Sequence, residues 1–241
     1  MVCITMKRED IVSEKGKSKS AKRVPLDQEQ IVLAAVKIAD EVGIEGLSMR
    51  KLGQVFGVEA MALYHHFASK EALIDSMVDS VHAEIEAPQA TDDWSVAMRR
   101  RAITAVNAVS GHRWAAPLME SRQNPGPASM QLIDATVECL RGAGFSIGMV
   151  AHTLSVLDAY TFGFAGQLRP AETVEQSAQM GIDIIERFPF DMYPHVGELI
   201  TEHVVKAGYR TIDEFEVGLD LILKGIAQLQ FTELSQDSQA K

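Results

Sequence analysis

The sequence LSMRKLGQVFGVEAMALYHHF, from Leu47 to Phe67, decides the fold that the rest of the chain must accommodate. Ser48 can accept hydrogen bonds from the free backbone N–H groups at the start of a helix. Gly57 stands where this helix should end, and glycine tolerates the positive φ of such a helix end. The stretch therefore predicts two short helices joined by a tight turn, which is the pattern of a helix-turn-helix.

Apolar residues recur at helical spacing in both halves of this stretch. Leu52 and Val55 predict the buried face of the first helix, and Leu63 and Phe67 predict that of the second. A DNA-binding helix-turn-helix has this pattern, but so does an ordinary corner between two helices. The spacing alone leaves both interpretations open.

The residue types at the end of the second helix favour DNA binding. Tyr64, His65 and His66 stand together, and Lys70 follows shortly after. All four side chains can donate to phosphate oxygens, and such contacts fix the position of a protein on the duplex. The adjacent histidines do not indicate a metal site, because zinc-binding histidine pairs on a helix are spaced i, i+4.

Many positions between Ser48 and Leu73 match one family pattern: Gly57, Val58, Leu63, Tyr64, His66, Phe67, Lys70, Ala72 and Leu73. The segment resembles the TetR family of one-component transcriptional regulators. Fainter similarity at Phe215–Ile226 resembles the last helix of the branch that contains the tetracycline repressors, and Ala143–Ser146 resembles the family's junction between the seventh and eighth helices. The resemblance implies an all-α fold, with an N-terminal three-helix helix-turn-helix DNA-binding domain and a C-terminal helical domain for ligand binding and dimerisation.

The resemblance also implies the residues that contact DNA. They are Ser48, Met49, Arg50, Ala60, Met61, Ala62, Tyr64, His65, His66 and Lys70. The family often has Gln, Thr or Pro where Ala60, Met61 and Ala62 stand here. Apolar side chains make no hydrogen bonds to bases, but they contact thymine methyl groups. We therefore expect methyl contacts and DNA shape to give the base preference, and phosphate contacts to give most of the affinity.

Composition excludes several other classes of protein. The 241 residues are 46% hydrophobic, which is sufficient for one or two globular domains. No apolar run approaches the roughly 20 residues that span a bilayer, and we expect neither a signal peptide nor a membrane partner. Cys3 and Cys139 lie far apart, which favours a reduced cytoplasmic protein. Because nucleophile-elbow, phosphate-loop and metalloprotease motifs are missing, a helical enzyme or a helical interaction protein is only an alternative.

The net charge of −10 is unevenly distributed along the chain. Residues 1–70 carry 11 Lys/Arg and 9 Asp/Glu, a balance of +2, whereas residues 71–241 carry 12 and 24, a balance of −12. The basic end is suited to DNA. The expected organisation is a flexible basic arm at 1–24, the DNA-binding domain at 25–70, the helical ligand-binding and dimerisation domain at 71–232 and a disordered tail at 233–241. The arm either follows DNA phosphates or is a solvated tail.

Helix signals continue along the chain. Asp27 and Gln30 form a capping box for the first helix, which Gly43 should end, and Ser69 should cap a fourth helix over 69–86. Further helices are expected from near Trp94 and over 128–142, 146–168, 171–187, 194–207 and 212–230, with one short helix within 112–127. The side chains of Arg99, Arg100 and Arg101 should fan around a solvated helix face.

Two of these helices predict a dimer. The segments 146–168 and 212–230 are apolar on more than one face, with Val150, Leu154, Leu157 and Thr161 on the first and Phe215, Leu219, Ile222 and Ile226 on the second. Such helices need a partner beyond their own core. Paired across a two-fold axis, they would form a four-helix bundle.

The resemblance implies an effector pocket in the helical body. Its expected lining is Arg101, Ala105, Met119, Arg122, Ile133, Val137, Leu154, Asp158, Phe162 and Gln167, although each apolar member could equally be a plain core residue. The tetracycline repressors hold a drug–magnesium chelate with two His, an Asn and a Glu. The corresponding positions here are Glu86, Arg101, Met119 and Gln167, and none matches. We therefore expect no metal and no cofactor, and a largely apolar effector.

The sequence thus predicts a homodimeric repressor that binds double-stranded operator DNA with palindromic symmetry. A small-molecule effector in the body would tilt the fourth helix, change the spacing of the two DNA-binding domains and release the DNA.

Overall fold

The computed structural model describes residues 26–121, 124–168, 174–187, 190–205 and 209–239. The described residues contain helices and turns and no strand, which confirms the all-α prediction. Within these ranges, no helix combines the length and the apolar character needed to cross a membrane. The expected basic arm at 1–24 lies outside the described residues.

The N-terminal head (residues 26–67) consists of α1 (Gln28–Val42), the short 3₁₀ helix η1 (Ile44–Gly46), α2 (Met49–Phe56) and α3 (Ala60–Leu63). Its start and stop signals are as predicted. The Asp27 side chain accepts a hydrogen bond of 2.8 Å from the Gln30 backbone N–H and caps α1. Gly43 ends that helix with a φ of 78°, a value that glycine adopts without strain.

The buried face of α2 differs from the prediction. Leu52 is fully buried, but Val55 is 59% exposed, so its expected place in the core is wrong. Met49 and Gly53 are the buried neighbours of Leu52. Met49 and Val55 each lie three residues from Leu52, so helical spacing alone does not separate them. Helix α2 contacts α1 and α3, and the face with Met49 and Gly53 is the buried one.

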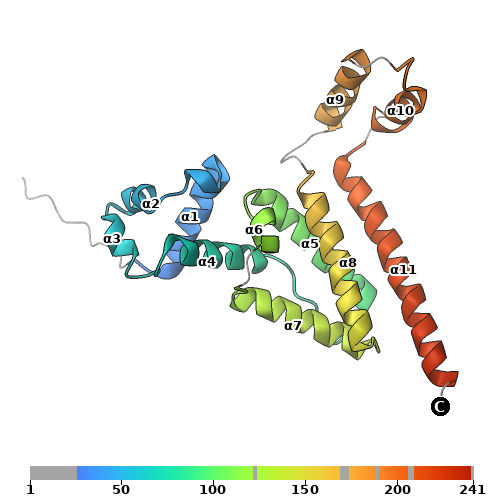
Figure 1. Ribbon diagram of the computed structural model, residues 1–241, viewed down its shortest axis with the longest axis horizontal. Helices are drawn as coiled ribbons and strands as arrows, with labels where there is room; N and C mark the ends of the chain where they lie inside the picture. Colours follow the sequence, from blue (N-terminus) through green and yellow to red (C-terminus); the bar gives the residue numbers. More distant parts are fainter. Residues whose placement is uncertain (1–25, 122–123, 169–173, 188–189, 206–208, 240–241) are drawn as a thin grey trace, which may run out of the picture.

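Helix α4 (Lys70–His82) joins the head to the body. The Ser69 hydroxyl accepts from the Ala72 backbone N–H at 3.0 Å, which confirms the predicted cap, but α4 ends before the expected residue 86. One side of α4 packs on α1, and α4 also contacts α5 (Trp94–Gly111) and α7 (Pro127–Gly142) of the body (Figure 1). A movement of α4 therefore reaches both parts of the chain.

The body comprises α5 (Trp94–Gly111), α6 (Ala116–Ser121), α7 (Pro127–Gly142), α8 (Ile147–Ala165), α9 (Val174–Arg187), α10 (Pro194–Leu199), the π-helical turn η2 (Ile200–Val204) and α11 (Thr211–Gln239). Helix α8 lies between α5 and α11, whereas α9 and α10 project away from this core (Figure 1). The α11 helix runs to Gln239, past the start of the tail expected at residue 233.

The buried apolar side chains of the described residues form two hydrophobic clusters. The first begins in the head, continues through α4 and reaches Ala105 and Ala108 of α5 and Trp114. The second lies among α5, α7, α8 and α11. Met119 and Phe162 pack against both clusters. The core of the head is therefore continuous with that of the body.

Candidate DNA interface and effector site

The turn between α2 and α3 is held by two glycines. Gly57 takes the left-handed conformation, with a φ of 64°, and the Val58 backbone N–H donates to the Gly53 carbonyl at 3.0 Å. A Cβ atom on Gly53 would lie 2.7 Å from the Val58 carbonyl oxygen, which is too close. Only glycine at residue 53 therefore permits this turn. Gly53 was missed in the sequence, where its signal was a glycine within a helical pattern.

Helix α3 is anchored by one side and exposes the other. Leu63 is fully buried and Phe67 is 5% exposed, as predicted, whereas Met61 is 69% exposed and Tyr64 42% exposed. His65 is also exposed, while Ala60, Ala62, His66 and Lys70 are partly buried. The Gln28 side-chain amide of α1 donates to the His66 carbonyl at 2.7 Å, which fixes the end of the α3 segment against α1.

The start of α2 also has exposed side chains. Ser48 and Arg50 are exposed, and the Ser48 hydroxyl accepts from the Lys51 backbone N–H at 3.2 Å. Met49 is only 6% exposed and packs in the core of the head, so the structure does not support its expected contact with DNA.

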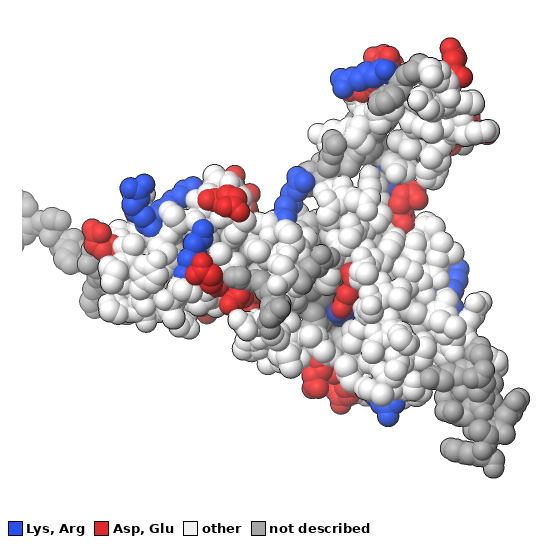
Figure 2. Space-filling view, in the orientation of Figure 1, with Lys and Arg blue, Asp and Glu red and all other residues white. Residues whose placement is uncertain are grey.

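The described head is not basic overall. Residues 26–70 carry four Lys/Arg and six Asp/Glu, so the positive balance of residues 1–70 comes from residues 1–25, outside the described part. Figure 2 shows both signs of charge interspersed on this face of the head. The cationic side chains available to attract phosphate within residues 26–70 are Lys37, Arg50, Lys51 and Lys70.

The three consecutive arginines of α5 have different environments. Arg99 pairs with Glu216 and Asp220 of α11, and Arg100 pairs with Glu86 and Asp92. Arg101 is only 3% exposed, so the expectation of a solvated face is wrong for this residue. Adjacent residues on a helix point in directions about 100° apart, and here one of those directions is the interior.

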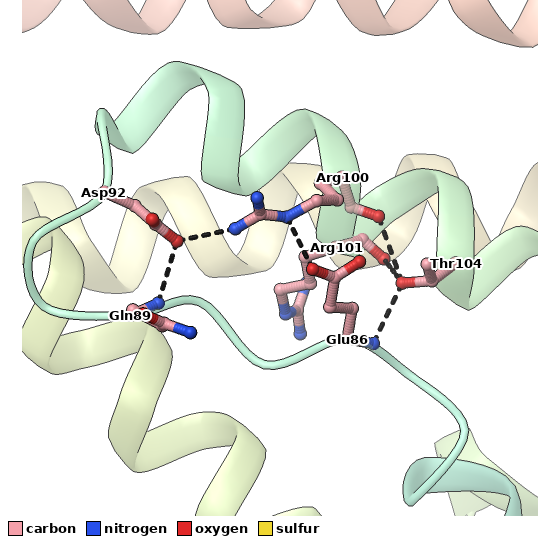
Figure 3. Close-up of polar contacts among 6 residues, drawn as sticks. All are labelled: Glu86, Gln89, Asp92, Arg100, Arg101 and Thr104. Carbon is pink, nitrogen blue, oxygen red and sulfur yellow. Dashed lines mark hydrogen bonds and ion pairs between the residues drawn. The ribbon is translucent and has the colours of Figure 1, made fainter.

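Arg100 fastens the segment between α4 and α5 (Figure 3). Its Nε atom lies 2.8 Å from Glu86 Oε1, and its Nη2 atom lies 2.6 Å from Asp92 Oδ2. Asp92 Oδ2 also accepts from the Gln89 backbone N–H at 3.0 Å, and Thr104 Oγ1 accepts from that of Glu86 at 3.0 Å. These contacts hold the connection against α5 at a position exposed to solvent.

Arg101 leaves α5 in another direction and enters the interior (Figure 3). Its Nη1 atom donates to Asp158 Oδ1 of α8 at 2.8 Å. Arg101 Nε and the hydroxyls of Thr153 and Thr161 are buried without a hydrogen-bond partner among the described residues. An unsatisfied donor on a buried cation is unusual in proteins, so the polar centre between α5 and α8 has capacity for an acceptor.

The expected pocket residues divide into three groups. Arg101 and Ala105 are buried, and Met119, Val137, Leu154, Asp158 and Phe162 are partly buried around the same α5–α8 region. Ile133 is 40% exposed and Gln167 is also exposed, so these two do not join the others in the interior. Arg122 lies outside the described residues.

Polar residues of α4 that the sequence analysis missed lie next to Met119. Asp79 accepts from the backbone N–H groups of Ala128 at 3.2 Å and Ser129 at 2.9 Å, and so caps α7 from another helix. Burial lowers the pKa of His82, which favours a neutral imidazole. Asp79, His82 and Met119 line a cavity of about 60 Å³. The i, i+3 spacing of Asp79 and His82 was the signal for a polar face of α4.

The positions that correspond to a magnesium chelate have other roles here. Glu86 binds Arg100, Arg101 binds Asp158, and the Gln167 amide donates to the Gly163 carbonyl at 3.4 Å. In the described ranges, no group of three or more His, Cys, Asp or Glu side chains is arranged to hold a metal ion.

Comparisons with known proteins agree with this architecture. Residues 31–77 match the model of the bacterial regulatory proteins of the tetR family, and residues 87–230 match that of the tetracyclin repressor-like C-terminal domain. The class A tetracycline repressor from transposon 1721 of Escherichia coli is 29% identical over 211 residues, which cover 84% of this chain and 91% of the repressor.

Two solved structures are similar over the same length. The Streptomyces coelicolor protein ActR in complex with (S)-DNPA has a TM-score of 0.64 at 25% identity, covering 84% of this chain and 98% of ActR. A possible TetR family regulator from Streptomyces coelicolor A3(2) has a TM-score of 0.67 at 27% identity, covering 84% and 100%. The chain thus belongs to the TetR family of ligand-responsive DNA-binding repressors.

Proposed function

We propose that this chain is a cytoplasmic homodimer that binds a palindromic operator through α3 and releases it when an effector binds the body. The observation that carries this proposal is the head geometry: Leu63 and Phe67 anchor α3, while Met61, Tyr64 and His65 face outward. The proposed domains are an arm at 1–24, the head with Lys70 at 25–70 and the body at 71–232.

We propose two kinds of DNA contact. Ala60, Met61 and Ala62 contact thymine methyl groups, because their side chains offer no hydrogen bond to a base edge. Phosphate contacts come from Ser48, Arg50, Tyr64, His65, His66 and Lys70. The first turn of α2 also presents backbone N–H groups that favour an anion. In this proposal the apolar residues of α3 determine the base preference, and the phosphate contacts provide most of the affinity.

The exposed faces of α8 and α11 support a dimer. Val150, Leu157, Phe215 and Leu219 are buried within the chain itself. Beyond them, large apolar side chains remain exposed on the two helices: Ile147, Val156, Val217, Leu221, Leu229 and Phe231. Exposed apolar surface on neighbouring helices is typical of a protein interface. We propose that these faces pair across a two-fold axis, with the two heads on successive major-groove faces of the operator.

We propose that the effector is largely apolar and carries one acidic or phenolic oxygen that binds Arg101. Support comes from the buried Nε without a described partner. Leu154 and Phe162 also stand one turn of α8 before and after Asp158, the residue that binds Arg101. A guanidinium group binds such oxygens through charge-assisted hydrogen bonds. A tetracycline–magnesium chelate fits poorly, because Arg101 would place a positive charge where the cation sits.

Helix α4 connects the two sites. It packs on α1 of the head, and its Asp79 caps α7 in the body. We propose that the effector displaces α7 and Met119, tilts α4 and changes the distance between the two heads. A coupling of about 1–3 kcal/mol, or about 5- to 150-fold in affinity, is typical of such regulation.

The test begins with footprinting of the purified chain on the DNA that flanks its own gene. We expect protection of a palindrome with half-sites about one helical turn apart. Tetracycline with magnesium is then added to the complex, with and without a chelator. Release that depends on magnesium at micromolar drug contradicts the proposed effector chemistry, and absence of any protected site contradicts the proposed DNA binding.

A further inference from the structure

A cluster of polar side chains joins the head to the body at a place separate from α3 and from Arg101. Asp40, on α1, accepts from Trp114 Nε1 at 2.7 Å, and the same Oδ1 atom lies 2.8 Å from His112 Nδ1. His112 Nε2 lies 3.0 Å from Glu84 Oε1, just beyond the end of α4. The head, the end of α4 and the α5–α6 turn thus meet at one imidazole ring.

This geometry defines the protonation of the ring. An ionised carboxylate only accepts hydrogen bonds, and a neutral imidazole has one N–H group to donate. Both nitrogens of His112 face carboxylates, so both contacts are hydrogen bonds only when the ring is the doubly protonated cation. Burial acts to lower the pKa of His112, but the hydrogen bonds and charges of Asp40 and Glu84 outweigh it and raise that pKa.

The surroundings of the cluster suit a joint between two parts. Trp114 is 6% exposed and packs in the hydrophobic cluster that includes Ala39 of α1, so it locates Asp40 without titrating. Arg113, the other charged neighbour in the turn, is exposed. A cavity of about 560 Å³ opens beside Asp40, Trp114 and Gly43. These directional contacts therefore act together with the packing of α1 on α4 in fixing the angle between head and body.

We propose that His112, as the cation, is a clamp that holds the head in the DNA-binding orientation, so that operator affinity falls when this ring loses its proton. Glu84 follows α4, so the clamp resists the α4 tilt proposed for effector release. This inference rests on the proposed function for its direction, but the clamp itself can be tested without DNA.

The sign of the pH dependence follows from linkage. The clamped state binds a proton more tightly than the released state, because its His112 pKa is raised above the ordinary value of 6.5. The clamp is therefore complete below pH 6.5 and is lost as the pH rises through the raised value. We expect weakening of operator binding between pH 6.5 and 8.5, not below this range.

The first experiment is NMR titration of the histidine ring protons in the full chain. We expect His112 to titrate above 6.5 in the wild type and at a lower pH in Asp40→Asn, which keeps an acceptor for Trp114. Glu45→Gln is the control, because it removes a carboxylate at the same junction, where Glu45 lines the cavity, and it should leave the titration of His112 unchanged. A wild-type His112 that titrates at or below 6.5 overturns the clamp.

The second experiment measures operator affinity at pH 6.5 and 8.5. We expect the wild type to lose about fivefold more affinity than His112→Gln over this interval, within the usual range of coupling between sites. His65 and His66 are present in both proteins, so any contribution from them cancels in the comparison. Equal losses overturn the clamp. A chain that binds no operator at either pH contradicts the proposed function, whereas the NMR titration still decides whether His112 is clamped.

Discussion

The helix caps of the head and the polar contacts at the centre of the body join residues at different separations along the chain. In the head and at the start of α4, Asp27 and Ser69 each cap a helix by accepting from the backbone three residues ahead. In the body, Arg101 binds Asp158, 57 residues away, and Asp79 caps Ser129, 50 residues away. These two caps therefore form within a local segment, whereas the two contacts of the body require distant segments to be folded together.

The largest effect should come from closing the space at Gly53. In Gly53→Ala, the new Cβ meets the Val58 carbonyl, so the turn must open. We expect a loss of about 2–3 kcal/mol in the stability of the head and a loss of about 30-fold or more in operator affinity, measured by fluorescence anisotropy. Gly111→Ala is the matched control, because its Cβ meets nothing within 4 Å. It should be neutral or stabilise the chain by up to about 1 kcal/mol.

Neighbouring arginines offer a direct comparison in the body. Arg101→Met leaves the Asp158 carboxylate without its buried partner, and we expect a loss of about 2 kcal/mol in the free energy of unfolding in urea. Arg100→Met removes pairs that lie near the surface, and it should cost less than about 1 kcal/mol. Equal losses of unfolding free energy in the two variants would show that the buried Arg101–Asp158 pair stabilises the body no more than the pairs of Arg100 do. The double variant Arg101→Met with Asp158→Leu should recover most of the stability.

Phosphate contacts of the head should appear in the salt dependence of DNA binding. Tyr64→Ala combined with Lys70→Ala should weaken DNA binding and lower the slope of log affinity against log salt by about one, because only the charged Lys70 neutralises a phosphate and releases a counterion. Both residues lie outside the hydrophobic core, so the thermal midpoint should change little. An unchanged affinity together with an unchanged slope would remove both residues from the DNA interface.

The smallest expected effect compares a local cap with a long-range one. Ser48→Ala and Asp79→Ala each remove a helix cap, and each should cost about 1 kcal/mol. Hydrogen exchange of the backbone amides should distinguish the two variants. Loss of the Ser48 cap should increase exchange only in the head, whereas loss of the Asp79 carboxylate should increase it in both α4 and the start of α7. Exchange confined to α7 in Asp79→Ala would argue against the coupling of these two helices.

Local signals explain why the head could be predicted from the sequence in most details. Asp27, Gly43, Ser48, Gly57 and Ser69 each act within a few residues, so the pattern that predicts them also contains their partners. Val55 was misassigned because its spacing from Leu52 is helical, although the helix face with Met49 and Gly53 is the buried one. Residue spacing shows that a helix has an apolar face, but the packing of neighbouring helices determines which face is buried.

The polar centre of the body could not be predicted in the same way. Arg99, Arg100 and Arg101 are identical side chains in sequence, and their environments depend on where α8, α11 and the α4–α5 connection return to α5. Of the pocket residues implied by the resemblance, Arg101 and Ala105 are buried, and Asp158 binds Arg101. Ile133 and Gln167 lie on exposed faces, and a resemblance alone does not decide which face of a helix is covered.

The cavity beside Met119 has a consequence for the dose of effector that the protein senses. At about 60 Å³ it is smaller than the roughly 300 Å³ of ordinary ligand sites. If the proposed effector reaches Arg101 by way of this cavity, it binds only molecules in which the cavity has opened. If about 1% of molecules are open, the apparent affinity is about a hundredfold weaker than the intrinsic one. The response threshold then depends on how often the body opens, and a substitution that never touches the effector can shift it.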